Sequence, residues 1–306
     1  MNRNAVKSLI VLLLFAVSVS GCSSKKISSK DSKDGVLHIV IVCHAESDPW
    51  DCGYRGLLKG TPQMMAVFQK VGEMAGIKIP TTFCVNPPTA KPEFFGSLYK
   101  QLLEDGHEIG LHTQGGAFSP GKQHKTLGPE DNEKRIPGDV KELVALGFPQ
   151  PRTYTPGNFS YIPTTTRVLE DAGIEVSCSV LPGEAGADGY DYTSVKSYKP
   201  YNPSYENNGL PGNSKLVEIP VSAWFTNLGT NRGEIISHLQ TRLVEAKESG
   251  EVDIFQIIWH PWEVIESKDY AKNVIEFLLL ISNFKGMRFS TASEAAKAWR
   301  DAQNSS

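Results

Sequence analysis

Short apolar runs alternate with segments of helical periodicity along most of this chain. Three runs have the length and the aliphatic content of buried strands: residues 36–44 (VLHIVIVCH), 106–113 (GHEIGLHT) and 254–262 (IFQIIWHPW). Between them, segments such as 62–75 repeat apolar side chains at the spacing of a helix face. About seven or eight such strand and helix units predict an α/β protein with a parallel sheet, most simply a barrel.

Turn and breaker residues place the remaining elements. Prolines mark helix starts and glycines mark helix ends. Segment 181–214 is rich in Gly, Pro, Tyr and Asn, and its tyrosines favour an ordered loop that faces a substrate. The other expected strands are 77–85, 152–155, 174–180, 216–221 and 287–290. The other expected helices are 92–105, 163–173, 233–249 and 269–284. Two more helices are expected, one after residue 128 that breaks near Pro137 and a last one that ends at Trp299.

Polar side chains gather at the carboxyl ends of the three strongest strands. His44 closes the first with Glu46 and Asp48 just after it, His112 closes the second, and His260 closes the third. Active sites of α/β barrels lie at this end of the strands. Histidines and carboxylates there favour a metal-dependent hydrolase, in which a metal activates water and side chains move the protons.

The first 35 residues carry targeting signals and no core. Arg3 and Lys7 precede an apolar run from residue 9 to 17, which is shorter than the roughly 20 residues that span a membrane. Small residues before Cys22 resemble a bacterial lipobox, which implies cleavage before Cys22 and its acylation; an ordinary signal peptide is the alternative. The predicted organisation is a signal peptide (1–21), an acylated cysteine with a flexible tether (22–35) and one barrel domain (36–306), exported and lipid-anchored on the periplasmic or cell-surface side of the envelope.

Charge and cysteines narrow the picture further. The formal net charge is −3, and removal of Arg3 and Lys7 with the signal peptide makes it −5. No basic stripe is present, so nucleic-acid binding is not expected. Beyond Cys22, four cysteines remain and allow three disulfide pairings, with buried free thiols at least equally expected. None has the spacing of a zinc cysteine cluster. These four are Cys43, Cys52, Cys84 and Cys178.

Several motifs, in order, resemble the polysaccharide deacetylase family, the NodB-homology group of carbohydrate esterases. The segment GHEIGLHT is similar to that family's GHEIGNHT, and Ile258–Trp262 is similar to its last motif. Residues 154–161 (YTPGNFSY) resemble its Arg-Pro-Pro-Gly region. The likeness extends over residues 36–300. It implies a distorted (β/α) barrel of about seven strands, one divalent metal, usually zinc, and hydrolysis of N- or O-acetyl groups on a sugar polymer.

The resemblance also assigns roles. By position, His112 is a metal ligand, His260 is the catalytic acid and Trp262 lines the pocket. The family's adjacent aspartates correspond to the end of the first strand, where Glu46 is the expected metal ligand and His44 or Asp48 the expected base. Substrate contacts are expected from Trp50, Tyr154, Asn158 and Trp262, whereas Trp224 and Trp299 are expected in the core.

Two departures from the family pattern leave alternatives open. The second metal histidine of the family corresponds to Gly116, so His124 is the candidate for the missing ligand, with Gln114 nearby. The arginine that orients the base falls near Thr155, and Arg152 is out of register. The sequence therefore predicts a zinc-dependent deacetylase acting on an envelope or extracellular polysaccharide. The alternatives are a glycan-binding lipoprotein without catalysis and a hydrolase of non-sugar amides; oligomeric state is not indicated.

Overall fold

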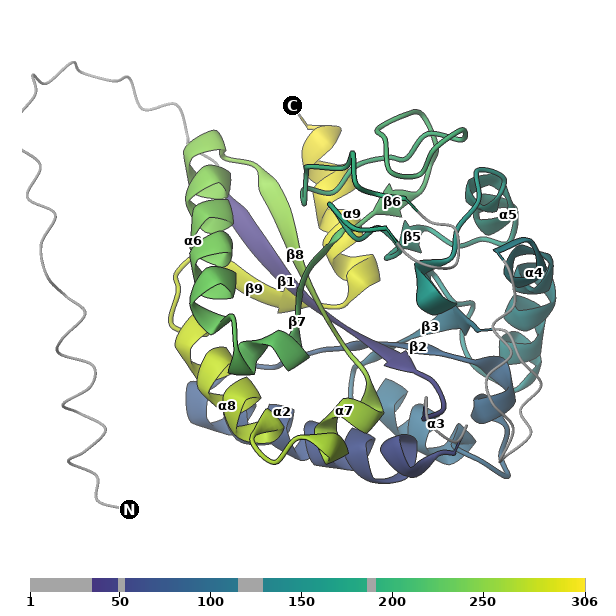
Figure 1. The fold of residues 1–306 in the computed structure, drawn as a ribbon, viewed down its shortest axis with the longest axis horizontal. Helices are drawn as coiled ribbons and strands as arrows, with labels where there is room; N and C mark the ends of the chain where they lie inside the picture. The colour runs from purple at the N-terminus through teal and green to yellow at the C-terminus, as the bar shows by residue number, and fades with distance from the viewer. Residues whose placement is uncertain (1–34, 49–52, 115–128, 186–190, 306) are drawn as a thin grey trace, which may run out of the picture. The chain divides into compact units, whose positions relative to one another are not determined.

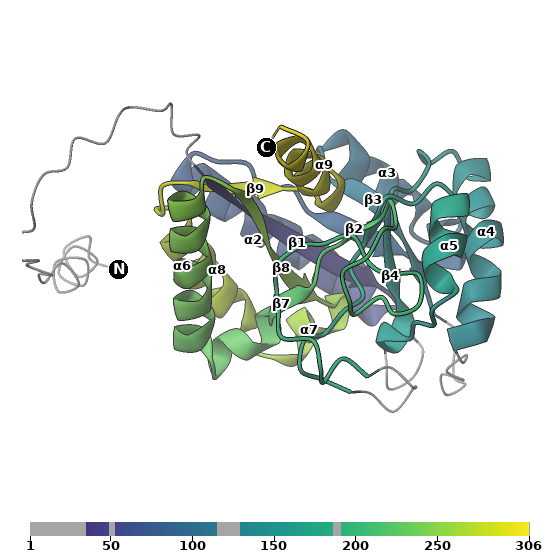
Figure 2. The ribbon, with the colours of Figure 1, turned by 90° about the horizontal axis from the view of Figure 1, so that it is seen from above.

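A curled parallel sheet covered by helices forms the described part of the chain (Figures 1 and 2). The computed structural model describes residues 35–48, 53–114, 129–185 and 191–305, all within the unit Lys33–Ser306. Strands run in the order β6-β5-β4-β3-β2-β1-β8-β7, with β9 paired to β1, and these pairings are parallel. The predicted distorted (β/α) barrel is confirmed, with nine described strands in place of about seven.

The order of elements alternates as the periodicity predicts. Strands are β1 (Val36–Ala45), β2 (Thr82–Val85), β3 (Glu108–Thr113), β4 (Thr153–Pro156), β5 (Val176–Ser177), β6 (Val217–Glu218), β7 (Val221–Trp224), β8 (Val252–Trp259) and β9 (Met287–Ser290). Helices are α2 (Thr61–Ala75), α3 (Gly96–Glu104), α4 (Pro129–Ala145), α5 (Thr165–Asp171), α6 (Arg232–Ser249), α7 (Pro261–Glu266), α8 (Tyr270–Ile281) and α9 (Ala292–Gln303). Shorter helical turns are η2 (Gly56–Gly60), η3 (Pro87–Ala90), η4 (Gly157–Phe159) and η5 (Phe225–Gly229).

Period-two alternation decides which strand residues face the helices and which face the inside of the curled sheet. In β1, Leu37, Ile39 and Ile41 belong to the core cluster under the helices, whereas Val40 and Val42 belong to a second, inner cluster. The same division runs along β8, where odd-numbered side chains face outward to the helices. Even-numbered residues at the ends of these strands therefore point inward.

The expected strand 216–221 is two strands at opposite edges of the sheet, which corrects the sequence prediction. β6 ends one edge of the strand order and β7 ends the other, and only Ile219 and Pro220 separate them along the chain. Pro220 has no N–H to donate to a ladder, so pairing stops there. The N–H of Ile219 still bonds Ser177 on β5 (2.8 Å) and that of Val221 bonds Val180 (2.9 Å). This crossing brings the two edges together.

Helices cover the outer face of the sheet. Figures 1 and 2 both place α4 and α5 on one flank and α6 and α8 on the other. Helix α4 continues through Pro137, which corrects the expected break. Ile136, Val140 and Leu143 are buried on both sides of the proline, and this packing holds the helix together despite the missing hydrogen bond. None of the helices in the described segments is long and apolar enough to cross a membrane.

The described parts of the loop between β5 and β6 are ordered by internal hydrogen bonds. The hydroxyl of Tyr201 donates to the carbonyl of Asn208 (2.6 Å), and the amide of Asn208 donates to Tyr192 (2.9 Å). Elsewhere, Cys43, Cys84 and Cys178 are buried free thiols. Burial raises their pKa values above the ordinary range, so they are packing residues. Cys22 and Cys52 lie outside the described residues.

Candidate active site

Three histidines from three strands meet on the inner face of the sheet. The ring centroid of His44 lies 5.1 Å from that of His112 and 5.0 Å from that of His260. Strand register explains the meeting, because Cys43 pairs with Trp259, so the next residue on each strand is a histidine. The predicted convergence of the strand ends is thus present, and all three rings are buried.

His112 is held from both ring nitrogens. Its Nδ1 lies 2.9 Å from Oγ1 of Thr155, the residue paired with it on β4. Its Nε2 faces two oxygens, Oε2 of Glu46 and Oε1 of Gln114, each at 3.1 Å. The backbone carbonyl of Gln114 in turn accepts a hydrogen bond from Arg135 on α4 (3.1 Å). Thr155 fixes the ring, so that Nε2 points at two acceptor oxygens.

His260 forms the opposite wall of the cluster and is oriented by Glu263. Its Nδ1 lies 2.9 Å from Oε1 of Glu263, and its backbone N–H donates to Oε2 of the same carboxylate (3.0 Å). Tyr270 donates a third hydrogen bond to that Oε2 (3.0 Å). Nε2 of His260 faces Oε1 of Glu46 at 3.5 Å. Burial disfavours the charged ring, but Glu263 and Glu46 outweigh it and raise the pKa of His260.

Two indoles stack on the His260 ring. Trp262 lies 4.9 Å from it with an interplanar angle of 23°, and Trp224 lies 5.8 Å away at 26°. Trp262 was expected in the pocket and is half-buried beside the cluster. Trp224 was expected in the core, but its ring is half-buried and forms part of the wall. Both indole faces thus pack against the buried imidazole of His260.

His44 is neutral and has an uncommitted nitrogen. Burial, followed by the charges of His260 and His112, holds its pKa well below the usual value. Its Nε2 is buried and has no hydrogen-bond partner among the described residues. Phe159 packs against the ring at 5.5 Å. Phe159 and the preceding Asn158 have φ values of 55° and 51°, a strained conformation in the loop that follows β4.

The other predicted site residues have different surroundings or lie outside the described residues. Asp48 is fully buried, and its two oxygens accept the backbone N–H groups of Arg55 and Gly56 at 2.9 Å, where η2 begins. Tyr154 is fully buried in the core under the helices, with its hydroxyl 2.7 Å from Thr113, and this position argues against a substrate contact. Asn158 is exposed on the rim. The expected ligand His124 and the expected stacking residue Trp50 lie outside the described residues.

The donor atoms fit a divalent metal in type and fall short in number. Within the described segments, no group of three His, Cys, Asp or Glu side chains is placed to hold a metal ion. Nevertheless Nε2 of His112 and Oε2 of Glu46 lie 3.1 Å apart, close to the separation of two ligands on one ion, since each bond would be about 2.0–2.2 Å. The orphaned, buried Nε2 of His44 adds a neutral imidazole beside them.

Solved structures with the same architecture give this geometry a context. A protein from Mycobacterium smegmatis assigned as a polysaccharide deacetylase matches with a TM-score of 0.60 at 17% identity, over 90% of this chain and 94% of that one. A protein from Pseudomonas aeruginosa PAO1 with the same assignment matches with a TM-score of 0.58 at 13% identity, over 88% and 91% of the two chains. The chain has the polysaccharide deacetylase fold.

At these identities the likeness establishes the fold and not the reaction. The same fold occurs in PuuE allantoinase, which matches with a TM-score of 0.58 at 13% identity over 88% of this chain and 92% of that one. No family model matches the sequence, and no curated protein matches it. The chain is therefore a divergent example of the deacetylase fold, and its activity is argued from its own site.

Sequence reasoning missed residues that act through others. Thr155 was noted only as the place of an absent arginine, yet it holds His112. Gln114 was named only as a neighbour of the missing ligand, yet it faces the same nitrogen of His112 as Glu46 does. Glu263 was missed, although its position three residues after His260, with Pro261 between them, is the spacing of a capping box. That spacing was the available signal.

Proposed function

We propose that this protein is a metal-dependent hydrolase that removes acetyl groups from a cell-envelope or extracellular polysaccharide. The observation that carries the proposal is Glu46, whose two oxygens reach His112 (3.1 Å) and His260 (3.5 Å) on a deacetylase fold. This carboxylate lies between two histidines whose roles follow from the family resemblance: His112 is the metal ligand and His260 is the catalytic acid. A largely buried carboxylate between two imidazoles is a common arrangement for acid and base chemistry.

The metal would be held by Glu46 and His112, with His124 as the proposed third ligand. Zinc with three protein ligands and one open position supplies a water of lowered pKa and polarises the scissile carbonyl. Thr155 keeps the His112 ring in the orientation that directs Nε2 toward Glu46. The atoms that face one another here are Nε2 of His112, Oε2 of Glu46 and Oε1 of Gln114. This mixture of nitrogen and oxygen ligands suits a divalent ion that accepts both, and zinc is our specific proposal.

The remaining residues divide the proton transfers. His260 carries the raised pKa and is the proposed acid, protonating the leaving amine or hydroxyl from Nε2. Glu263 holds its Nδ1, so the proton is presented from the nitrogen that faces Glu46. His44 is the proposed base, because it is neutral and its buried Nε2 has no partner among the described residues. Asp48, the other expected base, has both oxygens on backbone N–H groups.

The proposal is tested by acetate release and metal content measured together. The chain from Val36 to Ser306 is loaded with zinc, dialysed and assayed against N-acetylated and O-acetylated glycans, with allantoin as a non-sugar amide. We expect one zinc per chain and zinc-dependent acetate release, both lost in His112→Ala and His124→Ala. His107→Asn is the matched control, because His107 accepts the N–H of Thr81 away from the cluster (3.1 Å), and Asn can do the same.

Three outcomes would replace the proposal. Absence of bound metal after zinc loading would exclude metal-dependent hydrolysis. Glycan binding without acetate release would favour the non-catalytic lipoprotein, and turnover of allantoin but no glycan would favour the non-sugar amidase. Export and lipid anchoring at Cys22 belong to the same proposal. They are tested by mass analysis of the mature N-terminus, and an unmodified Cys22 would refute the anchor.

A further inference from the structure

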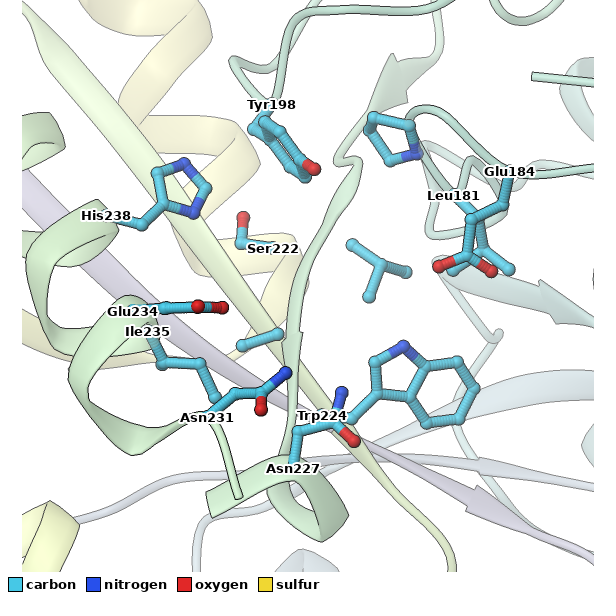
Figure 3. A pocket seen from close by; sticks show the side chains of 13 residues that line it. Leu181, Glu184, Tyr198, Ser222, Trp224, Asn227, Asn231, Glu234, Ile235 and His238 are labelled. Carbon is cyan, nitrogen blue, oxygen red and sulfur yellow. The ribbon is translucent and has the colours of Figure 1, made fainter. Parts of the chain in front are cut away.

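A polar cavity lies on the far side of Trp224 from the histidine cluster. Its volume is about 240 Å³, and its walls come from β7, η5, the first turns of α6 and the loop after β5. Figure 3 shows the carboxylates of Glu234 and Glu184 on opposite sides of the opening, with Tyr198 above and Asn227 below. Trp224 lines the cavity and also stacks on His260 at 5.8 Å, so the cavity and the candidate site share a wall.

The polar groups of this cavity are available to a ligand. The side-chain carboxylates of Glu184 and Glu234 have no ion-pair or hydrogen-bond partner among the residues that the structure describes, and both side chains are exposed. The side chains of Asn227, Asn231 and Tyr198 make no hydrogen bond within those residues either. Five polar side chains from three segments, the loop after β5, η5 and the start of α6, therefore line one space with their bonding capacity unused inside the protein.

The charge of the lining selects the ligand. Among the described residues, two carboxylates line the cavity, and no lysine or arginine does. The basic residues adjacent to the lining in sequence are engaged elsewhere: Lys199 pairs with Glu245 (3.5 Å) and Arg232 with Glu276 (2.8 Å). Burial lowers the pKa of His238, which lines the cavity, so this ring is neutral at pH 7. An anion is therefore repelled, and a compact cation is attracted.

Size and ring faces specify the ligand further. A cavity of about 240 Å³ that is open to solvent on one side is large enough for one sugar ring, and the rest of a chain can extend out of it. The rings of Trp224 and Tyr198 offer flat faces for the apolar side of a sugar, and Asn227 and Asn231 offer donors and acceptors for its hydroxyls. An ammonium group on that ring would face Glu184 or Glu234.

We infer that this cavity binds a single sugar unit with a free amino group, next to the acetylated unit that reaches the histidine cluster. Naming a sugar rests on the proposed function, whereas the preference for a cation rests on the lining alone. A deacetylated unit bound beside the reacting one would direct hydrolysis to acetyl groups that neighbour a free amine.

Nuclear magnetic resonance of the tryptophan indole N–H groups tests this inference directly. The chain has five tryptophans, and Trp224→Phe identifies the Trp224 signal. The probes are methyl glucosaminide (cation), methyl glucoside (neutral) and methyl glucuronide (anion). We expect the Trp224 signal to shift with the first probe at about fivefold lower concentration than with the second, and not with the third. Glu184→Gln and Glu234→Gln should each reduce the cation preference by roughly threefold.

Glu248→Gln is the matched control for charge. Glu248 is exposed on the same helix α6, 14 residues after Glu234 and so about 21 Å along its axis. Equal binding of the three probes would overturn the inference, as would shifts that spare Trp224 or an equal loss of preference in Glu248→Gln. The probes carry no acetyl group, so they report binding whether or not the protein is an enzyme. If the protein hydrolyses acetyl groups but the probes do not bind, only the proposed sugar binding in the cavity is refuted. If the probes bind but no acetyl group is hydrolysed, only the proposed reaction is refuted.

Discussion

Two carboxylates of low exposure, Glu46 (12%) and Glu218 (0%), have opposite surroundings. Glu46 follows the ten-residue strand β1 and faces the imidazoles of His112 and His260. Glu218 lies on the two-residue strand β6, where its oxygens accept the backbone N–H groups of Ser179 and Val180 and the hydroxyl of Ser179. Titratable side chains can exchange protons with Glu46, whereas fixed backbone donors can only hold Glu218 in place.

This difference indicates that Glu46 belongs to a reactive site, whereas Glu218 has a structural role at the edge of the sheet. The β1, β3 and β8 ends are set by long, continuous ladders, which place side chains accurately enough to meet. The β5 and β6 ladder has only two residue pairs, and Glu218 adds bonds that tie the chain after β5 to β6. Both carboxylates are buried or nearly so, and their partners distinguish the two roles.

Replacing each carboxylate by its amide is expected to give the largest difference between the two residues. Glu46→Gln removes the charge between the two histidines, and we expect acetate release to fall by about 100-fold or more. Glu218→Gln should leave the rate within about threefold, because Glu218 bonds no residue of the cluster in the described structure. Circular dichroism checks that both variants are folded. Similar rate losses in the two would show that Glu46 acts through stability.

Glu218 should instead control how stability depends on pH. Burial raises the pKa of Glu218 to about 7 in the folded protein, against a usual 4.5, which corresponds to about 3 kcal/mol. The folded state therefore holds the proton more tightly than the unfolded chain. The contribution of Glu218 to the free energy of unfolding is therefore greatest below pH 4.5, falls as the pH rises to about 7, and is constant above it.

Urea denaturation of the wild type and of Glu218→Gln between pH 4.5 and 7 measures this contribution. The amide keeps one oxygen for the two backbone donors and turns its NH₂ toward Ser179, so the fold is retained. We expect the variant to lose the part of the slope that Glu218 supplies, while other groups titrate as before. Identical slopes in the two proteins would mean that Glu218 has the same pKa in the folded and unfolded states.

Thr155→Val separates the orientation of His112 from the fold. The valine has nearly the same shape but makes no hydrogen bond with Nδ1 of His112, which lies 2.9 Å from the threonine hydroxyl. Loss of such an outer contact commonly reduces metal affinity or activity about 10-fold to 100-fold. Zinc affinity is measured by competition with a chelator. Thr113→Val is the matched control, since its hydroxyl bonds the core Tyr154 (2.7 Å), and its zinc affinity should not change.

The sequence predicted the residues of the long strands well and their supporting contacts poorly. Apolar periodicity placed β1, β3 and β8 and the histidines at their ends, because a buried parallel strand is a continuous apolar run. It overextended the second strand, which begins at Thr82 and not at residue 77, because Ile79 is buried without pairing in the sheet. Thr155 and Gln114 could not be predicted as supports, since cross-strand register decides their contacts and one sequence does not specify it.

The closing of the sheet was also beyond the sequence. Residues 216–221 form one apolar run, and nothing local shows that β6 and β7 lie at opposite ends of the strand order. Pro220 was the only local indication of an interruption. The cavity beside Trp224 depends on this arrangement, since β7 supplies one wall and the loop after β5 supplies another. Contacts between distant segments therefore decide both of the features that periodicity missed.

Substitutions at Glu263, on the His260 side of the cluster, are expected to change the rate least, and Glu263 can be compared with Glu218. Like Glu218, it is buried and accepts three hydrogen bonds, from the backbone and ring of His260 and from Tyr270. Unlike Glu218, it holds a ring of the proposed site. Glu263→Gln should lower kcat about tenfold and leave KM within about twofold, because the amide orients His260 without stabilising its charge. Tyr270→Phe removes one bond to the same carboxylate and should lower kcat only about twofold. Equal losses in the two variants would mean that the orientation of Glu263, and not its charge, governs His260.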